Sequence, residues 1–215
     1  NRSLSNQMKL TYNLADSSRY VFQASLSGDF SHVPGDFSQK QIVDGAQTYT
    51  ALEQQQSQSS SPVLDLYYFQ QFTPRQSLTL NAVGTYIGTQ SSDSYDEGSP
   101  YRYNVDGRTY SLLSEAIYEN RLKPFTLSAG LNYNQKYTNN EYTGDVSSVT
   151  PMHHNRVYLF SEIKGTWDKL RYSAGIGGSY LHYRQQAHSY DYWSFCPKAC
   201  LLYTSPSPRD RSVSR

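Results

Sequence analysis

The stretch SLTLNAVGTYIGTQ, residues 77–90, alternates between two kinds of side chain. On an extended chain one face carries Leu78, Leu80, Ala82, Gly84 and Tyr86, and the other carries Thr79, Asn81, Val83 and Thr85. A period of two residues is typical of a β-strand with one apolar face. The stretch therefore predicts a strand.

The same alternation recurs along the chain. It is clear at 125–134 and at 170–180, where apolar residues again occupy every second position. Weaker copies lie at 7–14, 20–30, 61–72, 108–122, 154–167 and 190–199. No segment shows clear helical spacing of its apolar residues, so the sequence predicts an all-β protein with nine strands.

The connections between these strands alternate in length. Short ones lie at 15–19, 73–75, 123–124 and 168–169. Long polar ones lie at 31–60, 91–107 and 139–153, with a shorter one near 185–189. Short turns that alternate with long loops are typical of an outer-membrane β-barrel, in which the turns are periplasmic and the loops are external.

Hairpin register supports these strands. If Asp168 and Lys169 form a two-residue turn, Trp167 meets Leu170 on one face and Thr166 meets Arg171 on the other. The faces match in the same way across residues 123–124. A slip of one residue would mix the two faces, so the agreement favours an antiparallel up-and-down sheet.

The two faces differ in polarity. The apolar set is almost free of charge along its middle and has aromatic residues near both ends: Phe72, Phe125, Trp167 and Tyr172 near the turns, and Phe30, Tyr86, Tyr110, Tyr133 and Tyr180 near the loops. The opposite face carries Asp65, Glu115, Glu119, Arg121, Glu162, Lys164 and Arg171. Two aromatic girdles around an apolar band indicate a surface in lipid, and the charged face suits a wet lumen.

Composition narrows the function classes. The chain has 215 residues with 21 tyrosines, and its net charge of +1 gives no electrostatic case for nucleic acid. No run of about 18 apolar residues is present, which excludes a membrane-spanning helix. The competing soluble fold is a β-sandwich, but sandwich strands are usually about 5–6 residues long, and several here are longer.

No catalytic, cofactor or metal site is predicted. His153 and His154 are adjacent and would point to opposite faces of a strand. Glu115 and Glu119 lie about 13 Å apart along one face, too far for a glycosidase pair, and Glu162, Lys164 and Arg171 are expected to form lumen ion pairs. The acidic spacing at 91–98 lacks the ligand order of an EF-hand. The chain is not expected to be an enzyme and needs no cofactor.

Three stretches carry a family resemblance: SPVLDLYYFQQFTPRQSLTLNAVGTYIGT at 61–89, LSAGLNYNQKYTNNEYTGD at 127–145 and YDYWSFCPKA at 190–199. They resemble the barrel of the outer-membrane family allied to TonB-dependent receptors of Bacteroidetes-type bacteria. The resemblance covers residues 1–199 and implies a partial transmembrane barrel in the cell outer membrane, in contact with its lipid. The metagenomic character of the chain is a further expectation.

The family implies energised uptake. A plug and a TonB-contacting segment are expected upstream of Asn1, and the outer loops are expected to capture a ligand that the resemblance does not identify. A passive porin or adhesin-like barrel without a plug is the first alternative. A secreted carbohydrate-binding β-sandwich is the second.

The last residues interrupt the alternation. Residues 200–210, CLLYTSPSPRD, are identical to one reading frame of the transposase adaptor used in sequencing libraries, and Val213, Ser214 and Arg215 fit the frame of the adaptor that follows. We therefore expect 200–215 to be a non-native, adaptor-derived and disordered tail. A natural linker rich in Pro, Ser and Arg would explain the composition but not the order.

Overall fold

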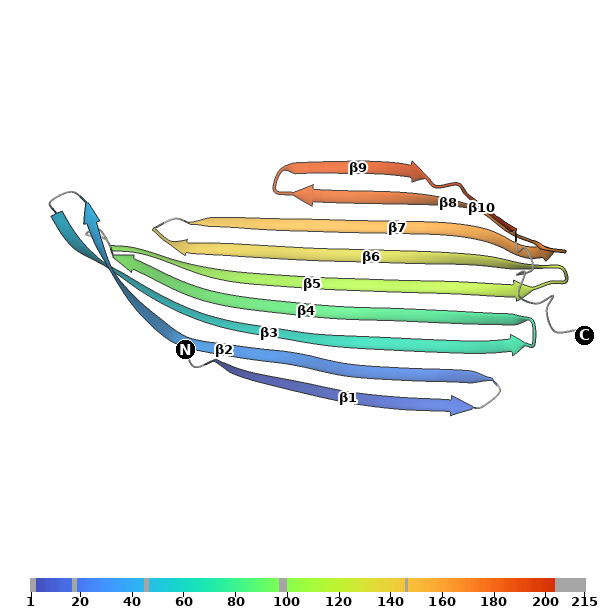
Figure 1. Cartoon of the computed structure of the whole chain (residues 1–215), viewed down its shortest axis with the longest axis horizontal. Coiled ribbons are helices and arrows are strands. Elements are labelled where there is room, and N and C mark those ends of the chain that lie inside the picture. Colours follow the sequence, from blue (N-terminus) through green and yellow to red (C-terminus); the bar gives the residue numbers. More distant parts are fainter. Residues whose placement is uncertain (1–2, 17–18, 45–46, 97–99, 146, 204–215) are drawn as a thin grey trace, which may run out of the picture.

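The computed structural model describes residues 3–16, 19–44, 47–96, 100–145 and 147–203. Its strands are β1 (Leu4–Asp16), β2 (Tyr20–Asp44), β3 (Gln47–Thr73), β4 (Gln76–Asp96), β5 (Pro100–Arg121), β6 (Phe125–Gly144), β7 (Ser148–Trp167), β8 (Leu170–Gln185), β9 (His188–Phe195) and β10 (Lys198–Tyr203). They form one antiparallel sheet in which each strand from β1 to β8 pairs with the next along the chain (Figure 1). The described residues contain no helix long and apolar enough to cross a membrane.

The four short connections lie at one end of the sheet, as predicted from their spacing. They join β1 to β2, β3 to β4, β5 to β6 and β7 to β8, on the right in Figure 1. We call this the turn end and the opposite end the hairpin end. The turn between β7 and β8 is formed by Asp168 and Lys169, with Asp168 at a φ of 53°. A positive φ at the first of two turn residues matches the twist of the flanking strands.

The predicted long loops at 31–60, 91–107 and 139–153 are wrong, because strands continue through most of them. The pairing of β2 with β3 runs from Tyr20 opposite Gln70 to Asp44 opposite Gln47, with one irregularity between Val33 and Asp36. β4 and β5 likewise pair out to Asp96 opposite Pro100. Polar residues indicated loops, but a sheet ladder is made by the backbone, and hydroxyl and amide side chains are compatible with a solvated strand.

β9 and β10 act as one strand. Both pair with β8, Phe195 opposite Gly178 and Lys198 opposite Gly175, and the register does not change between them. Cys196 and Gly177 exchange two backbone hydrogen bonds of 2.8 and 3.1 Å across the junction. Only Pro197, which has no N–H to donate, interrupts the ladder. The sheet therefore has nine continuous strands, the number that the sequence predicts.

The expectation that residues 200–215 lie unpaired is wrong for the first four of them. Cys200–Tyr203 belong to β10 and lie opposite Leu170–Ser173 of β8. The edge of β8 presents unpaired N–H and C=O groups, which accept any extended segment of suitable residues. This pairing therefore does not bear on the origin of the tail. Residues 204–215 lie outside the described residues.

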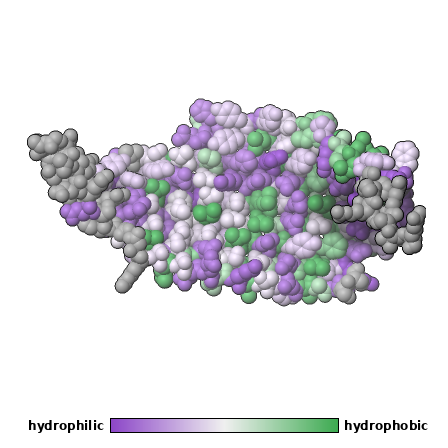
Figure 2. Space-filling view, in the orientation of Figure 1, coloured by the Kyte–Doolittle hydropathy of each residue, from purple (hydrophilic) through white to green (hydrophobic). Residues whose placement is uncertain are grey.

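The sheet is a single open layer, and its polarity is reversed relative to a soluble domain. Apolar residues of the central strands are the exposed ones: Leu131 is 39% exposed, Leu159 58% and Ile176 62%. On the other face the polar residues Ser128, Glu162 and Ser179 are less than a tenth exposed. In Figure 2 hydrophobic residues gather over the middle and right of the face in view and become sparse toward the hairpin end on the left.

Candidate functional site

Two faces follow from the register. The apolar face carries Leu80, Ala116, Leu131, Leu159 and Ile176, and rows of directly opposed residues connect them across β4 to β8. The polar face carries Asn81, Glu115, Asn132, Tyr158 and Ser179, which form one such row, and Glu162. All the residues that the sequence assigned to the lipid band of these strands lie on the apolar face.

An aromatic row crosses the apolar face toward the hairpin end. Tyr86, Tyr110, Tyr137 and His153 come from β4, β5, β6 and β7 and lie directly opposite one another in turn. Their ring centroids are 4.9, 6.2 and 4.5 Å apart. We call these four residues the tyrosine row. Its members have an apolar ring body and a polar tip, the side-chain type that favours a membrane–water boundary.

The girdle continues onto the last strand. Trp193 of β9 packs against Tyr180 at 4.6 Å between ring centroids, and Asp191 accepts a hydrogen bond of 2.7 Å from the Tyr180 hydroxyl. Asp191 also pairs with His182 Nδ1 at 2.8 Å. Tyr180 was predicted as a girdle residue from the sequence, and Trp193 was not. The hairpin register between β8 and β9 places Trp193 directly opposite Tyr180, and this register could have predicted Trp193 as a girdle residue.

An ion cluster lies on the polar face near the turn end. The Glu162 carboxylate is 3.0 Å from Lys164 Nζ and 2.9 Å from Lys198 Nζ. Lys198 lies two strands away, and Gly175, which stands between them in the register, has no side chain to block the contact. The predicted pair of Glu162 with Lys164 is confirmed. Arg171 does not take part in the cluster. The pair of Lys198 with Glu162 was not predicted, because Lys198 reaches the carboxylate across Gly175, a position that has no side chain.

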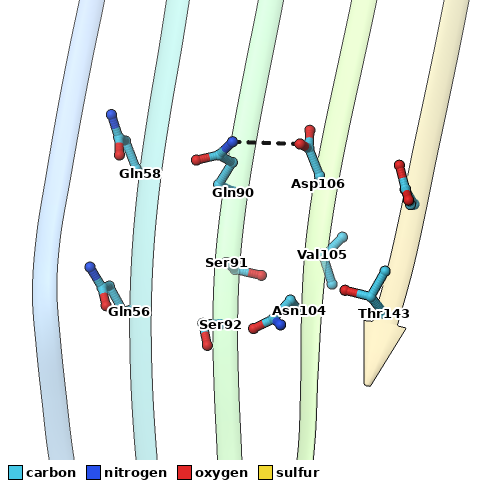
Figure 3. A pocket seen from close by; sticks show the side chains of 10 residues that line it. Gln56, Gln58, Gln90, Ser91, Ser92, Asn104, Val105, Asp106 and Thr143 are labelled. Atoms are coloured by element: carbon cyan, nitrogen blue, oxygen red, sulfur yellow. Dashed lines mark hydrogen bonds between the residues drawn. The ribbon is translucent and has the colours of Figure 1, made fainter. Parts of the chain in front are cut away.

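A polar hollow lies on β3 to β6 toward the hairpin end, with a volume of about 430 Å³. Figure 3 shows its side chains in two rows across the strands. One row is Gln58, Gln90, Asp106 and Glu141, and the other is Gln56, Ser92, Asn104 and Thr143. Ser91 and Val105 complete the lining. The sequence places most of these residues in separate predicted loops, so the hollow is not predictable from it.

Asp106 is the most strongly held side chain of the hollow. Arg108 donates two hydrogen bonds to its carboxylate, from Nε at 3.1 Å and from Nη2 at 2.9 Å. Gln90 Nε2 donates a third, at 3.5 Å (Figure 3). The bonds from Arg108 hold the pKa of Asp106 below its usual value. Asp106 is therefore an anion whose charge Arg108 balances.

The other candidate residues from the sequence lie apart from one another and form no common site. His153 is on the apolar face against Tyr137, and His154 is opposite Lys136 on the polar face. Glu115 accepts a hydrogen bond of 3.4 Å from Asn81, and Glu119 lies opposite Ser77 and Ser128. Within the described part of the chain no group of three or more His, Cys, Asp or Glu side chains could hold a metal ion. The acidic stretch 91–98 is only partly within the described residues.

The fold and the reversed polarity define a class of structure, an unclosed antiparallel up-and-down β-sheet of the kind that forms a barrel wall. The ferric citrate transporter FecA, in its unliganded form, is similar to it with a TM-score of 0.55 and 12% sequence identity, over 94% of this chain and 39% of the transporter chain. The ferric yersiniabactin uptake receptor FyuA from Yersinia pestis aligns with a TM-score of 0.45 and 13% identity, over 93% of this chain and 34% of its own. No protein-family profile and no curated protein matches the sequence.

The likeness to the citrate transporter shows the fold. This chain spans about two fifths of the length of that transporter, since the aligned region covers 39% of it. The similarity confirms the expectation of an antiparallel up-and-down sheet of about nine strands that is not closed.

Proposed function

We propose that this chain is part of the wall of an outer-membrane β-barrel that takes up a ligand, of the class of TonB-dependent receptors. The observation that carries the proposal is the reversed polarity of the sheet. Leucine and isoleucine side chains cover the exposed face, while carboxylates, amides and hydroxyls occupy the less exposed one. Such a face is stable in hydrocarbon, and it would be an aggregation hazard in water.

The role in uptake has separate support. The fold is that of a protein described as a ferric citrate transporter, and the resemblance of residues 61–89, 127–145 and 190–199 to the TonB-allied barrel family agrees with it. In such a barrel the polar face lines the passage, and a TonB-type complex would supply the energy by acting on a plug. The residues described here would then guide passage rather than catalyse a reaction.

A substitution pair on β6 tests the membrane assignment. Leu131→Arg places a charge on the apolar face and Asn132→Arg places the same charge on the polar face, one residue further along the strand. If the apolar face meets hydrocarbon, Leu131→Arg should cost about 2–4 kcal/mol of folding free energy near the bilayer midplane. Asn132→Arg should cost much less, because Asn132 lies opposite Glu115, which can pair with the new cation.

The measurement is made on the complete barrel that contains this chain, folded into phospholipid vesicles and titrated with urea, because the open edges of the sheet leave backbone groups unpaired in lipid. Ile176→Arg on β8 repeats the test at a second exposed apolar position. Gly177 of the same strand, which the alternation also assigns to the polar face, is an unsuitable control. A Cβ there would lie 2.5 Å from the Tyr158 hydroxyl oxygen. Equal destabilisation by Leu131→Arg and Asn132→Arg would contradict the proposal.

A further inference from the structure

We propose that the polar hollow on β3 to β6 binds the saccharide headgroup of a glycolipid in the surrounding membrane leaflet. The inference rests on the proposed function, because it takes the apolar face of the sheet as the face in lipid. It adds a binding site on the outside of the wall, separate from the passage that the polar face would line.

The register places the hollow on the outside. Gln90 and Ser92 lie four and six residues beyond Tyr86 on β4, so the period of two puts them on the same face as the tyrosine row. Asp106 and Asn104 stand in the same relation to Tyr110 on β5, and they are the direct partners of Gln90 and Ser92. No register shift separates the hollow from the row on β4, β5 or β6. The hollow therefore continues the apolar face beyond its aromatic boundary.

The tyrosine row and the hollow are close enough for one amphiphile to contact both. Four residues of strand separate Tyr86 from Gln90, a distance of about 13 Å. Gly88 lies between Tyr86 and Gln90 on β4, and the Tyr86 ring extends over it. A Cβ at Gly88 would lie 2.8 Å from the Tyr86 hydroxyl oxygen. The polar tip of Tyr86 thus points toward the hollow. A lipid whose chains lie along the apolar face would place its headgroup at the hollow.

The lining chemistry selects a neutral, hydroxyl-rich headgroup. Six of the hollow's side chains make no hydrogen bond or ion pair within the described part of the chain: Gln56, Gln58, Ser92, Asn104, Glu141 and Thr143. Amides and hydroxyls both donate and accept, and a carboxylate accepts. A saccharide hydroxyl can donate to the carboxylate and accept from the amides, so it can satisfy both kinds of group.

Anionic and apolar ligands fit less well. Arg108, two residues from Asp106 on β5, is held by two hydrogen bonds to the Asp106 carboxylate and is not free for a phosphate. Val105 is the one aliphatic residue in the lining, which offers little surface to an acyl chain. The carboxylates of Asp106 and Glu141 would also repel a second anion.

Binding to defined lipids tests the site. The full 215-residue chain is folded in sugar-free detergent micelles and titrated with a fluorescent dioleoyl glycerolipid that has a digalactosyl headgroup. Phosphatidylcholine with the same chains and free digalactoside are the comparison ligands. The variant Asn104→Leu/Thr143→Val removes two hydrogen-bonding groups from the hollow at nearly constant shape. Its matched control, Asn134→Leu/Thr150→Val, makes the same changes on the polar face.

We expect the hollow variant to weaken digalactosyl-lipid binding at least fivefold and the control to leave it unchanged. Circular dichroism verifies strand content, and Thr143→Val alone is used if the double variant does not fold. Equal affinity for phosphatidylcholine, or equal loss in hollow and control variants, would overturn the site. If the free digalactoside binds as tightly as the digalactosyl lipid, the proposal that the ligand is a membrane lipid is wrong. The Leu131 and Asn132 pair tests the membrane assignment independently, so the two failures can be told apart.

Discussion

Gly175 on β8 controls the ion cluster by having no side chain. It lies between Glu162 and Lys198 in the register, and the ammonium of Lys198 crosses the space above it to reach the carboxylate. A Cβ at Gly175 would lie 2.9 Å from the backbone oxygen of Ser161 and 3.3 Å from the Glu162 Cβ. The backbone at Ser161 cannot move aside as a flexible side chain can, so any residue larger than glycine at position 175 would clash with it.

Gly175→Ala should therefore destabilise the sheet by about 1–3 kcal/mol, the usual cost of overpacking. Gly178→Ala is the matched control, because Gly178 lies on the same strand and a Cβ there meets nothing within 4 Å. We expect Gly178→Ala to change stability little. Urea unfolding of both variants in vesicles provides the comparison. A control variant as unstable as Gly175→Ala would show that the contact at Gly175 is not the cause.

At the scale of the strand, the sequence predicts faces better than ends. The alternation at 77–90 and 170–180 predicts which residues share a face, because successive side chains of a strand point to opposite faces of the sheet. It does not predict that β2 continues to Asp44, because polarity alone does not distinguish a solvated strand from a loop. The hollow was not predictable for a related reason. Its residues come from four strands and meet only once those strands are in register.

The turn between β7 and β8 provides a test at this scale. Asp168 has a φ of 53°, in the left-handed region that glycine adopts without cost and β-branched residues do not. Asp168→Val should reduce stability by about 1–2 kcal/mol. Asp168→Gly at the same position should leave stability unchanged or raise it slightly. The folded fraction in vesicles as a function of urea measures both, and similar effects of valine and glycine would refute a role for the backbone angle.

At the scale of the whole molecule, the sheet is one layer whose two faces need different environments. Neither face has a second layer of the described chain packed on it, since every strand contact is with a neighbour in the same sheet. A lipid environment on one side and a lumen on the other would supply both. We propose that further strands complete the wall, because open strand edges leave backbone groups unpaired in lipid.

The tail provides the corresponding test. We propose that residues 200–215 derive from a sequencing adaptor, on the identity of 200–210 to one of its reading frames. An independent read of the locus, from a library made without that adaptor, should replace CLLYTSPSPRD by a further alternating strand and should encode a plug-like region upstream. A read that reproduces the tail would remove the adaptor explanation. Further strands without a plug would favour the passive barrel.

The uninterrupted register of β4 to β8 has a consequence for how this wall tolerates changes in length. No shift occurs along the pairings of β4 with β5, β5 with β6, β6 with β7 or β7 with β8. One residue inserted just before Leu131 on β6 would turn every later side chain of that strand over, moving Leu131 to the polar face and Asn132 to the apolar face. Two inserted residues would restore the faces. Among natural variants of this wall, length changes within these strands should come in even numbers, whereas the tips of the hairpins should vary by any number.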